Sequence, residues 1–386
     1  MNISSAHTFD YHSTSRVIYG AGTLDQLGAL ARQLAGPRIL LVTDPGIVAA
    51  GICDRTRHIL QEADLEPFAF SEVEENPTTE HVEQGVHFAR QHGPIDLIVG
   101  LGGGSAMDCA KGINFILTNG GKMEDYWGRD KAQKPMLPAI GAPTTAGTGS
   151  EAQSFALISR AETHEKMACG DRKARFRTVI LDPTLTASAP QNVTAATGLD
   201  AIAHAVESYV TTARNPISQM FAREAWRLLA QNFAAVLDVE ADRTHPAITE
   251  VRGHMLLGAH LAGMAIENSM LGAAHACANP LTARCGMTHG VAIALLLPHV
   301  IRYNSSAVGD LYTQLCSAAQ LKSDDLAAEI DKLKTIANLP HHLRDCQIDA
   351  EDLPQMAREA AGQWTGTFNP RPLDEADFLQ LYEAAY

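Results

Sequence analysis

A short apolar segment that runs into consecutive glycines constrains the fold of this chain more than any other feature. Residues 95–100 have the length and composition of a buried strand, residues 102–104 are all glycine, and a helical pattern follows over 107–117. Strand, turn and helix in this order are typical of a parallel sheet covered on both faces. The alternation is repeated by apolar runs at 38–44 and 65–70 and by a helical pattern at 79–91. The first half therefore predicts a Rossmann-like α/β domain with a parallel sheet.

The glycine-rich turn has two interpretations. Backbone N–H groups of a glycine turn at a helix N-terminus approach a phosphate closely, and the helix dipole favours the anion. A flexible loop explains Gly-Gly-Gly-Ser about as well, and the G-x-G-x-x-G spacing of the standard dinucleotide fingerprint is absent. A second run of small and hydroxyl residues, 143–151, reads on its own as a polar loop that caps a helix.

After residue 190 the pattern becomes long and helical, with abundant Ala and Leu. We expect helices at about 198–213, 216–236, 248–268, 272–284, 289–302, 307–318, 323–336 and 350–361. A chain of 386 residues has room for two cores. The sequence thus predicts an α/β domain over 1–190 and an all-helical domain over 191–386.

One predicted helix contains a carboxylate and an imidazole at metal-ligand spacing. Asp200 and His204 are four residues apart, which rotates their side chains by only about 40° in a helix, so both point the same way. A pair of this kind is equally common as a support on a helix surface. His275 and His289 lie in the predicted helices at 272–284 and 289–302. Three imidazoles and one carboxylate suit Fe²⁺ or Zn²⁺ better than Ca²⁺ or Mg²⁺.

The segments around these four residues resemble the iron-containing (group III) alcohol dehydrogenase family, which includes lactaldehyde reductases and 1,3-propanediol dehydrogenases. The matching stretches include Gly198-Leu-Asp200, Leu271-Gly-Ala-Ala-His275 and His289-Gly290-Val-Ala, and the likeness extends over about residues 19–381. It implies a dehydroquinate synthase-like fold with one catalytic metal ion, Fe²⁺ or Zn²⁺. The implied ligands are Asp200, His204, His275 and His289.

One departure from the family pattern falls beside the third implied ligand. Family members usually have a second His four residues after it, whereas this chain has His275-Ala-Cys-Ala-Asn279. Asn does not titrate near neutral pH, so the proton traffic and substrate set of the family carry over less securely. His275 and Asn279 are the expected catalytic positions, and His299 is a second candidate for a titrating group.

The resemblance also implies that NAD is the cofactor. Asp44, at a strand end, would accept a hydrogen bond from the adenine ribose and repel a 2′-phosphate, although a turn or cap role is its ordinary interpretation. The glycine loop would hold the pyrophosphate, and the threonine run would border the nicotinamide. The expected cofactor contacts are Asp44, Asn76, Gly102, Gly103, Gly104, Ser105, Asp108, Thr144, Thr145, Thr148, Lys166 and Leu185.

The expected activity is hydride transfer between NAD(H) and a small primary alcohol or aldehyde, or a 1,2-diol or hydroxyaldehyde. The substrate is expected in a cleft between the domains, with Phe155, Ile266 and Trp364 as candidate pocket residues, although core packing explains each of them as well. Three alternatives stay open. These are a glycerol dehydrogenase-like enzyme, a dehydroquinate synthase-like enzyme, and a non-catalytic NAD-binding protein.

Composition excludes some partner classes. The net charge of −14 argues against nucleic acid and anionic membranes. Seven scattered cysteines without C-x-x-C spacing, a polar N-terminus and the lack of an apolar run of about 18 residues favour a reduced, cytoplasmic protein that does not span a membrane. By resemblance, a homo-oligomer is expected.

Overall fold

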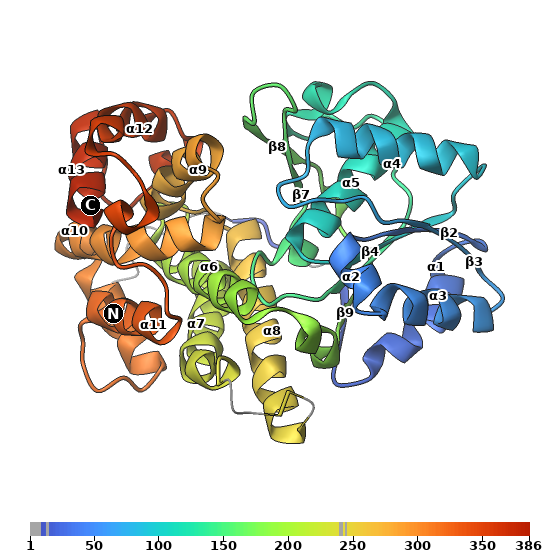
Figure 1. Cartoon of the computed structure of the whole chain (residues 1–386), viewed down its shortest axis with the longest axis horizontal. Helices are drawn as coiled ribbons and strands as arrows, with labels where there is room; N and C mark the ends of the chain where they lie inside the picture. Colours follow the sequence, from blue (N-terminus) through green and yellow to red (C-terminus); the bar gives the residue numbers. More distant parts are fainter. Residues whose placement is uncertain (1–8, 13–14, 239–241, 244) are drawn as a thin grey trace. The chain divides into compact units, whose positions relative to one another are not determined.

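The structure, a computed structural model, describes residues 9–12, 15–238, 242–243 and 245–386. The chain forms two compact units. The α/β unit consists of Ser15–Thr194 and Asp238–His260; the helical unit consists of Met1–Thr14, Ala195–Leu237 and Leu261–Tyr386. The chain therefore crosses between the units more than once. Asp238–His260 is assigned to the unit that contains the sheet, although it follows α6 and α7 in sequence. Figure 1 labels the elements of both units along the chain.

The α/β unit is built on a six-stranded sheet with the order β1-β9-β6-β4-β2-β3, in which every pairing is parallel. Its strands are β1 Arg16–Tyr19, β2 Arg38–Val42, β3 Glu66–Phe70, β4 Leu97–Gly102, β6 Ala139–Pro143 and β9 Thr178–Leu181. The expected parallel sheet is confirmed. Parallel neighbours that are distant in sequence require crossover connections, which the intervening helices supply.

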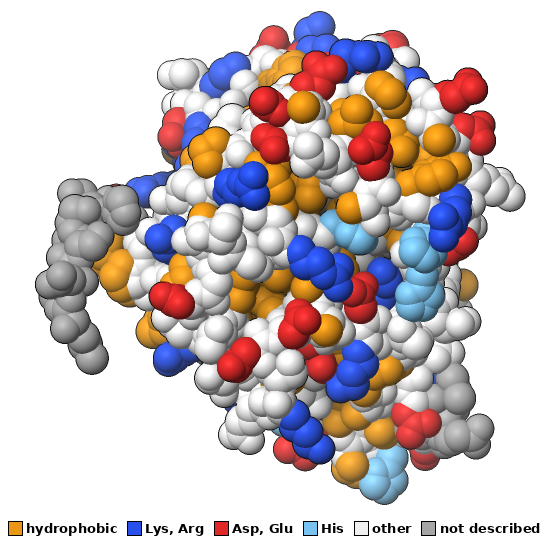
Figure 2. Space-filling view, turned by 90° about the vertical axis from the view of Figure 1, so that its left-hand side faces the viewer, with side chains coloured by type: hydrophobic (Ala, Val, Ile, Leu, Met, Phe, Trp, Pro, Cys, Tyr) orange, Lys and Arg blue, Asp and Glu red, His pale blue; other side chains and the backbone are white. Residues whose placement is uncertain are grey.

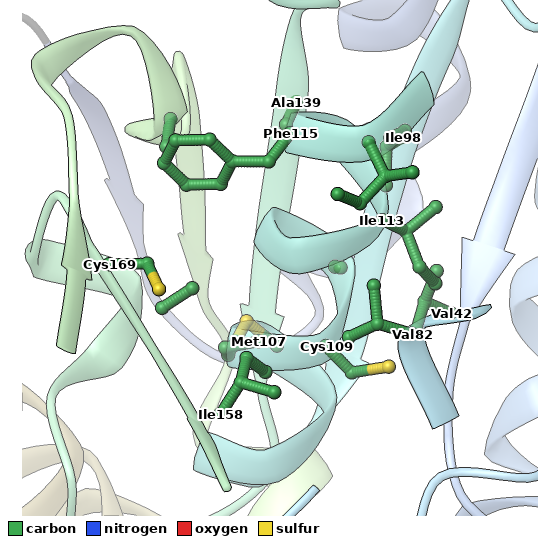
Figure 3. Close-up of a cluster of buried hydrophobic side chains, with 14 of the residues drawn as sticks. Val42, Val82, Ile98, Met107, Cys109, Ile113, Phe115, Ala139, Ile158 and Cys169 are labelled. Carbon is green, nitrogen blue, oxygen red and sulfur yellow. The ribbon is translucent and has the colours of Figure 1, made fainter. Parts of the chain in front are cut away.

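Alternate residues of the central strands enter two separate hydrophobic clusters. Leu40 and Val42 of β2 pack into one cluster, whereas Leu41 packs into the other. Successive side chains of a strand point to opposite faces, so both faces of this sheet are buried and its strands read as continuous apolar runs. Figure 3 shows one cluster, with Val42 and Ile98 beside Ile113 of the helix that follows β4.

Helices and a small second sheet complete the α/β unit. The helices are α1 Leu27–Leu34, α2 Pro45–Ala49, α3 Ile52–Glu62, α4 Thr79–Gln91 and α5 Gly104–Asn119, with short 3₁₀ helices η1 Thr23–Gln26, η2 Met123–Tyr126, η3 Ser150–Ala152, η4 Arg172–Ala174 and η5 Pro183–Ser188. The small sheet has the order β5-β8-β7, where β5 is Gly128–Arg129, β7 Phe155–Ser159 and β8 Lys166–Gly170. The hairpin β7–β8 thus lies in a sheet of its own.

The helical unit contains no strand among its described residues, which confirms the expected all-helical second part. Its helices are α6 Gln191–Val210, α7 Pro216–Val236, α9 Ala273–Cys285, α10 His289–Ala318, α11 Leu326–Ile336, α12 Leu353–Ala361 and α13 Glu375–Ala385, with η6 Leu343–Cys346, η7 Ala350–Asp352 and η8 Trp364–Phe368. Residues of α6 and of α8, Pro246–Glu267, are divided between the two units.

Helix α10 covers two of the helices expected from the sequence. It continues through 289–318 with a kink at Val308, whose φ of −137° is not helical. Its length and composition would suffice to cross a membrane, but 61% of its most apolar window is buried, as in the core helix of a globular unit.

On the face of the molecule in Figure 2, acidic and basic side chains are interspersed.

Candidate metal centre and cofactor loops

Helix α6 places Asp200 and His204 one turn apart on the same face, as their spacing predicts. Both side chains are buried, and His204 Nε2 lies 3.4 Å from Asp200 Oδ1. Because both side chains are buried, the pair is not a stabilising ion pair on the helix surface. Helix α6 points the carboxylate and the imidazole into the interior of the helical unit.

His275 and His289 converge on the same carboxylate. His275, near the start of α9, places Nε2 3.5 Å from Asp200 Oδ1, and His289, the first residue of α10, places Nε2 3.9 Å from it. Donor atoms of Asp200, His275 and His289 all lie within 4.8 Å of one another. The ring of His204 stacks on that of His275, with centroids 4.8 Å apart. All four predicted ligands are thus gathered around one carboxylate oxygen.

The polar atoms at the middle of this cluster fit a divalent cation. Asp200 Oδ1 and His275 Nε2 are buried and have no hydrogen-bond partner within the described part of the chain. A buried polar atom without a partner costs about 1–3 kcal/mol, and a metal ion satisfies such lone pairs. Burial alone would raise the pKa of Asp200, but the imidazoles of His204, His289 and His275 hold it well below its ordinary value. The carboxylate is therefore ready to accept a cation.

Glu207 fixes the orientation of His275, a role that we did not infer from the sequence. Its Oε2 lies 2.5 Å from His275 Nδ1, and its Oε1 accepts the backbone N–H of Ala274 at 2.7 Å. Burial lowers the pKa of His275, but Glu207 and Asp200 more than reverse this and raise it to about 9. A carboxylate on Nδ1 holds the proton there and leaves Nε2 as the ligand atom. Glu207 is seven residues after Asp200, on the same helix face, so a signal was present.

Asn279 lies one turn after His275 on α9 and is half-buried. Its Nδ2 donates to Gln363 Oε1 at 2.9 Å, so the side chain is held by a second amide. Thr282, on the same face, lies 3.4 Å from His289 Nδ1. His299 is no substitute for a titrating group near neutral pH, because burial and the neighbouring cations Arg302 and Lys334 lower its pKa to about 4.

The glycine loop and the threonine run are brought together at neighbouring strand ends. Gly102 ends β4, Thr144 follows β6, and the N–H of Thr144 donates to the carbonyl of Gly102 at 2.9 Å. Gly102 has φ +147°, which side-chain-bearing residues rarely adopt. At Gly104 a Cβ would lie 2.5 Å from the side chain of Thr148, and at Gly103 it would lie 3.4 Å from Thr145. The threonine side chains therefore pack directly against the backbone of this loop, where a residue other than glycine would not fit at Gly104, and α5 begins at that residue.

Asp44 caps a helix with one carboxylate oxygen and has its other oxygen at the glycine loop. It follows β2, the strand next to β4, and its Oδ1 caps α2 by accepting the N–H of Ile47 at 3.0 Å. Its Oδ2 faces Gly102, where a Cβ would lie 2.8 Å from it. Burial raises the pKa of Asp44, against the N–H groups of Ile47 and Gly46. One oxygen is used by the cap, and the other lies at the glycine loop.

Asp108 lies behind the loop, in a buried polar cluster. Ser150 Oγ donates to Asp108 Oδ1 at 2.5 Å, and Lys111 Nζ donates to Ser150 O at 2.7 Å and to Phe155 O at 2.6 Å. Burial raises the pKa of Asp108, while Lys111 opposes this shift. Lys111 was missed because its acceptors are about forty residues away in sequence. This cluster supports the loop from within the unit.

The other predicted cofactor positions have varied surroundings. Lys166 Nζ donates to Asn76 Oδ1 at 3.2 Å. Two of the predicted cofactor contacts, one on β8 and one in the turn before α4, are therefore in contact with each other. Ser105 is half-buried in the first turn of α5. The side chain of Leu185 is fully buried in a core cluster.

The three candidate pocket residues also differ from one another. Phe155 lies on β7 with the guanidinium of Arg129 4.8 Å from its ring centre. Ile266 is buried on α8. Trp364 is 43% exposed on η8 and packs edge-on against Phe368. Core packing thus describes Ile266 best, while Trp364 has a surface that a ligand can contact.

Comparison with known proteins identifies the family. Residues 14–183 match the iron-containing alcohol dehydrogenase domain, and residues 194–386 match the C-terminal domain of the Fe-containing alcohol dehydrogenase family. The 1,3-propanediol dehydrogenase of Klebsiella pneumoniae is 34% identical over 393 residues, which cover 99% of this chain and 100% of that protein.

Solved structures agree with this match. The crystal structure of a 1,3-propanediol oxidoreductase has a TM-score of 0.93 and 34% identity, and covers 98% of this chain and 100% of that one. Sulfoacetaldehyde reductase from Bifidobacterium kashiwanohense, in complex with NAD⁺, has a TM-score of 0.88 and 26% identity, covering 98% and 99%.

Fold and relatives define an alcohol dehydrogenase of the iron-containing class. The chain belongs to the iron-containing alcohol dehydrogenase family. The glycerol dehydrogenase-like, dehydroquinate synthase-like and non-catalytic alternatives are not favoured, because full-length relatives are alcohol and diol dehydrogenases.

Proposed function

We propose that this chain transfers a hydride between NAD(H) and a small primary alcohol or aldehyde, or a 1,2-diol or hydroxyaldehyde. In this proposal Asp200, His204, His275 and His289 bind one Fe²⁺ or Zn²⁺ ion. The observation that carries it is the convergence of three imidazoles on Asp200 Oδ1, with the ring of His275 held by Glu207.

Each residue has a part that follows from its chemistry. When bound, the metal supplies a Lewis acid for the substrate oxygen. Glu207 keeps the proton of His275 on Nδ1. Asn279 and Gln363 offer only neutral amide groups, so they bind and orient a substrate but do not exchange protons with it near neutral pH.

The glycine and threonine loops are proposed to hold the cofactor. Backbone N–H groups at the start of α5 suit the pyrophosphate, since a helix N-terminus favours an anion. The carboxylate of Asp44 beside Gly102 suits the ribose of NAD and disfavours the 2′-phosphate of NADP. Residues 1–190 would thus supply the cofactor site and 191–386 the metal site. We further propose that the protein is cytoplasmic and a homo-oligomer that binds no nucleic acid or membrane.

Metal content and NADH-linked turnover, measured together on anaerobically purified protein, test this proposal. Wild type should contain about one Fe or Zn per chain, and His275→Ala should lose both the metal and more than about 99.9% of turnover, since a Lewis acid is worth several kcal/mol. His341→Ala, an exposed histidine of the same unit, is the matched control. A wild-type protein that binds NAD⁺ but holds no metal and turns over no alcohol would overturn the proposal.

A further inference from the structure

One face of α8 presents three buried side chains to the α/β unit at intervals of four residues. Arg252 Nη1 donates to Thr186 O at 2.9 Å, Leu256 packs into the hydrophobic cluster of Figure 3, and His260 Nδ1 lies 3.0 Å from Glu151 Oε1. Each of these residues is at most 3% exposed. Residues at this spacing lie on one face of a helix. That face of α8 is therefore held to the rest of the α/β unit by a cation, an apolar side chain and an imidazole.

Glu151 is the last residue of the threonine run 143–151, here called the threonine loop, so its contact with His260 has a consequence for the cofactor site. The loop ends at η3, where Ser150 accepts from Lys111 and its N–H donates to Thr148 Oγ1 at 3.2 Å. Gln153 Nε2 donates to Thr148 O at 3.0 Å. The position of Thr148, which lies against Gly104, therefore depends on how η3 is held.

The Glu151–His260 contact is buried and charge-assisted. Both side chains are at most 4% exposed. A carboxylate only accepts hydrogen bonds, so the proton lies on His260 Nδ1, and Nε2 has no partner within the described residues. Removing either member leaves a polar group of the other buried without its partner, which is more costly than losing an exposed pair.

We propose that Glu151 and His260 are a positioning pair that holds the threonine loop in the conformation that binds the dinucleotide. This inference rests on the proposed cofactor site. Lys111 fixes Ser150 from one direction, and His260 fixes the next residue from α8. The pair belongs to the α/β unit and the four metal-ligand candidates belong to the helical unit. We therefore expect its loss to act on cofactor binding and to leave the metal in place.

Substitutions at His260 separate the two ring nitrogens. Asn places its amide nitrogen near the position of Nδ1, whereas Gln reaches the position of Nε2. We expect His260→Ala and His260→Gln to weaken NADH binding about tenfold, the loss of one charge-assisted hydrogen bond, and His260→Asn to restore most of it. Fluorescence titration of the metal-loaded protein with NADH measures the dissociation constant, and KM for the alcohol should stay unchanged.

Arg252→Met is the matched control, because it disrupts the same face of α8 away from the threonine loop. It should lower thermal stability and leave NADH affinity unchanged. Equal weakening in Arg252→Met, wild-type affinity in His260→Ala, or rescue by Gln rather than Asn would each overturn the positioning role. Failure of the wild type to bind NADH would instead overturn the proposed function on which the inference rests.

Discussion

The two units build their candidate sites in opposite ways. In the α/β unit the candidate site depends on glycines, because a Cβ at Gly102 or Gly104 would overlap neighbouring side chains such as that of Thr148. In the helical unit it is made by side chains that converge on Asp200 Oδ1 and need a buried glutamate to orient them. Added atoms should therefore damage the first site, and removed atoms or charges the second. A substitution in the cofactor site should leave the metal bound, and a substitution in the metal site should leave the cofactor bound.

Outside the metal-ligand candidates themselves, the largest effect should come from Glu207→Gln. The two carboxylate oxygens of Glu207 accept from His275 Nδ1 and from the N–H of Ala274. Glutamine has only one side-chain oxygen and cannot accept from both, so the imidazole loses its fixed orientation. We expect metal affinity to fall about 10- to 100-fold. Competition with a chelator measures it. Glu224→Gln, which alters an exposed ion pair with Arg227 in the same unit, should have no effect; wild-type metal affinity in Glu207→Gln would remove the orienting role.

Gly104→Ala should weaken NADH binding roughly tenfold while metal content stays at the wild-type level. The new methyl group would meet Thr148 at 2.5 Å, an overpacking that typically costs about 1–3 kcal/mol. Calorimetric titration with NADH gives the affinity. Gly362→Ala is the control, because its nearest neighbour would be 3.4 Å away. Loss of metal in Gly104→Ala would contradict the independence of the two sites.

A smaller effect is expected for Asp44→Ser, which keeps a helix-capping oxygen but removes the charge beside Gly102. The ratio of kcat/KM for NADPH to that for NADH should rise several-fold, because the 2′-phosphate no longer meets a carboxylate. Steady-state kinetics with both cofactors measures the ratio. If it does not move, Asp44 serves only as the cap of α2.

The last prediction concerns stability at acid pH and should affect neither candidate site. His299 has a folded pKa of about 4 against an ordinary value of 6.5. Between these values the unfolded chain binds a proton that the folded chain does not, so the free energy of unfolding falls as pH drops from 6.5 to 4. Denaturant unfolding of His299→Gln should show a shallower fall than wild type. Parallel curves would mean that His299 is hydrated in the folded state.

Local patterns predicted what local interactions determine. Helix α4 begins and ends where its periodicity indicated. Spacing and resemblance pointed to four metal-ligand candidates, and donor atoms of three of them lie within 4.8 Å of one another. Helix α13 was missed, although Asp374 and Asp377 form a capping box and Phe378 and Tyr382 recur at helical spacing. That signal was present in the sequence and was not used.

Other features depend on contacts that no local pattern contains. Lys111 looks like an ordinary polar residue of an amphipathic helix, yet it is buried because Ser150 and Phe155 supply acceptors. In the same way, the periodicity of α8 gives no indication that Leu256 packs with the α/β core. Helical periodicity identifies a buried face but not the partner that covers it.

The membership of α8 in the α/β unit has a consequence for how the chain folds as it is synthesised. Residues 15–194 leave the ribosome well before 246–260, so the surface that Leu256 and His260 cover stays open during that interval. Nascent chains with exposed apolar surface are prone to aggregate. A fragment ending at residue 190 should therefore need a chaperone or a supplied α8 peptide to remain dispersed. The same dependence makes this helix a poor place to cut the chain when its halves are expressed separately.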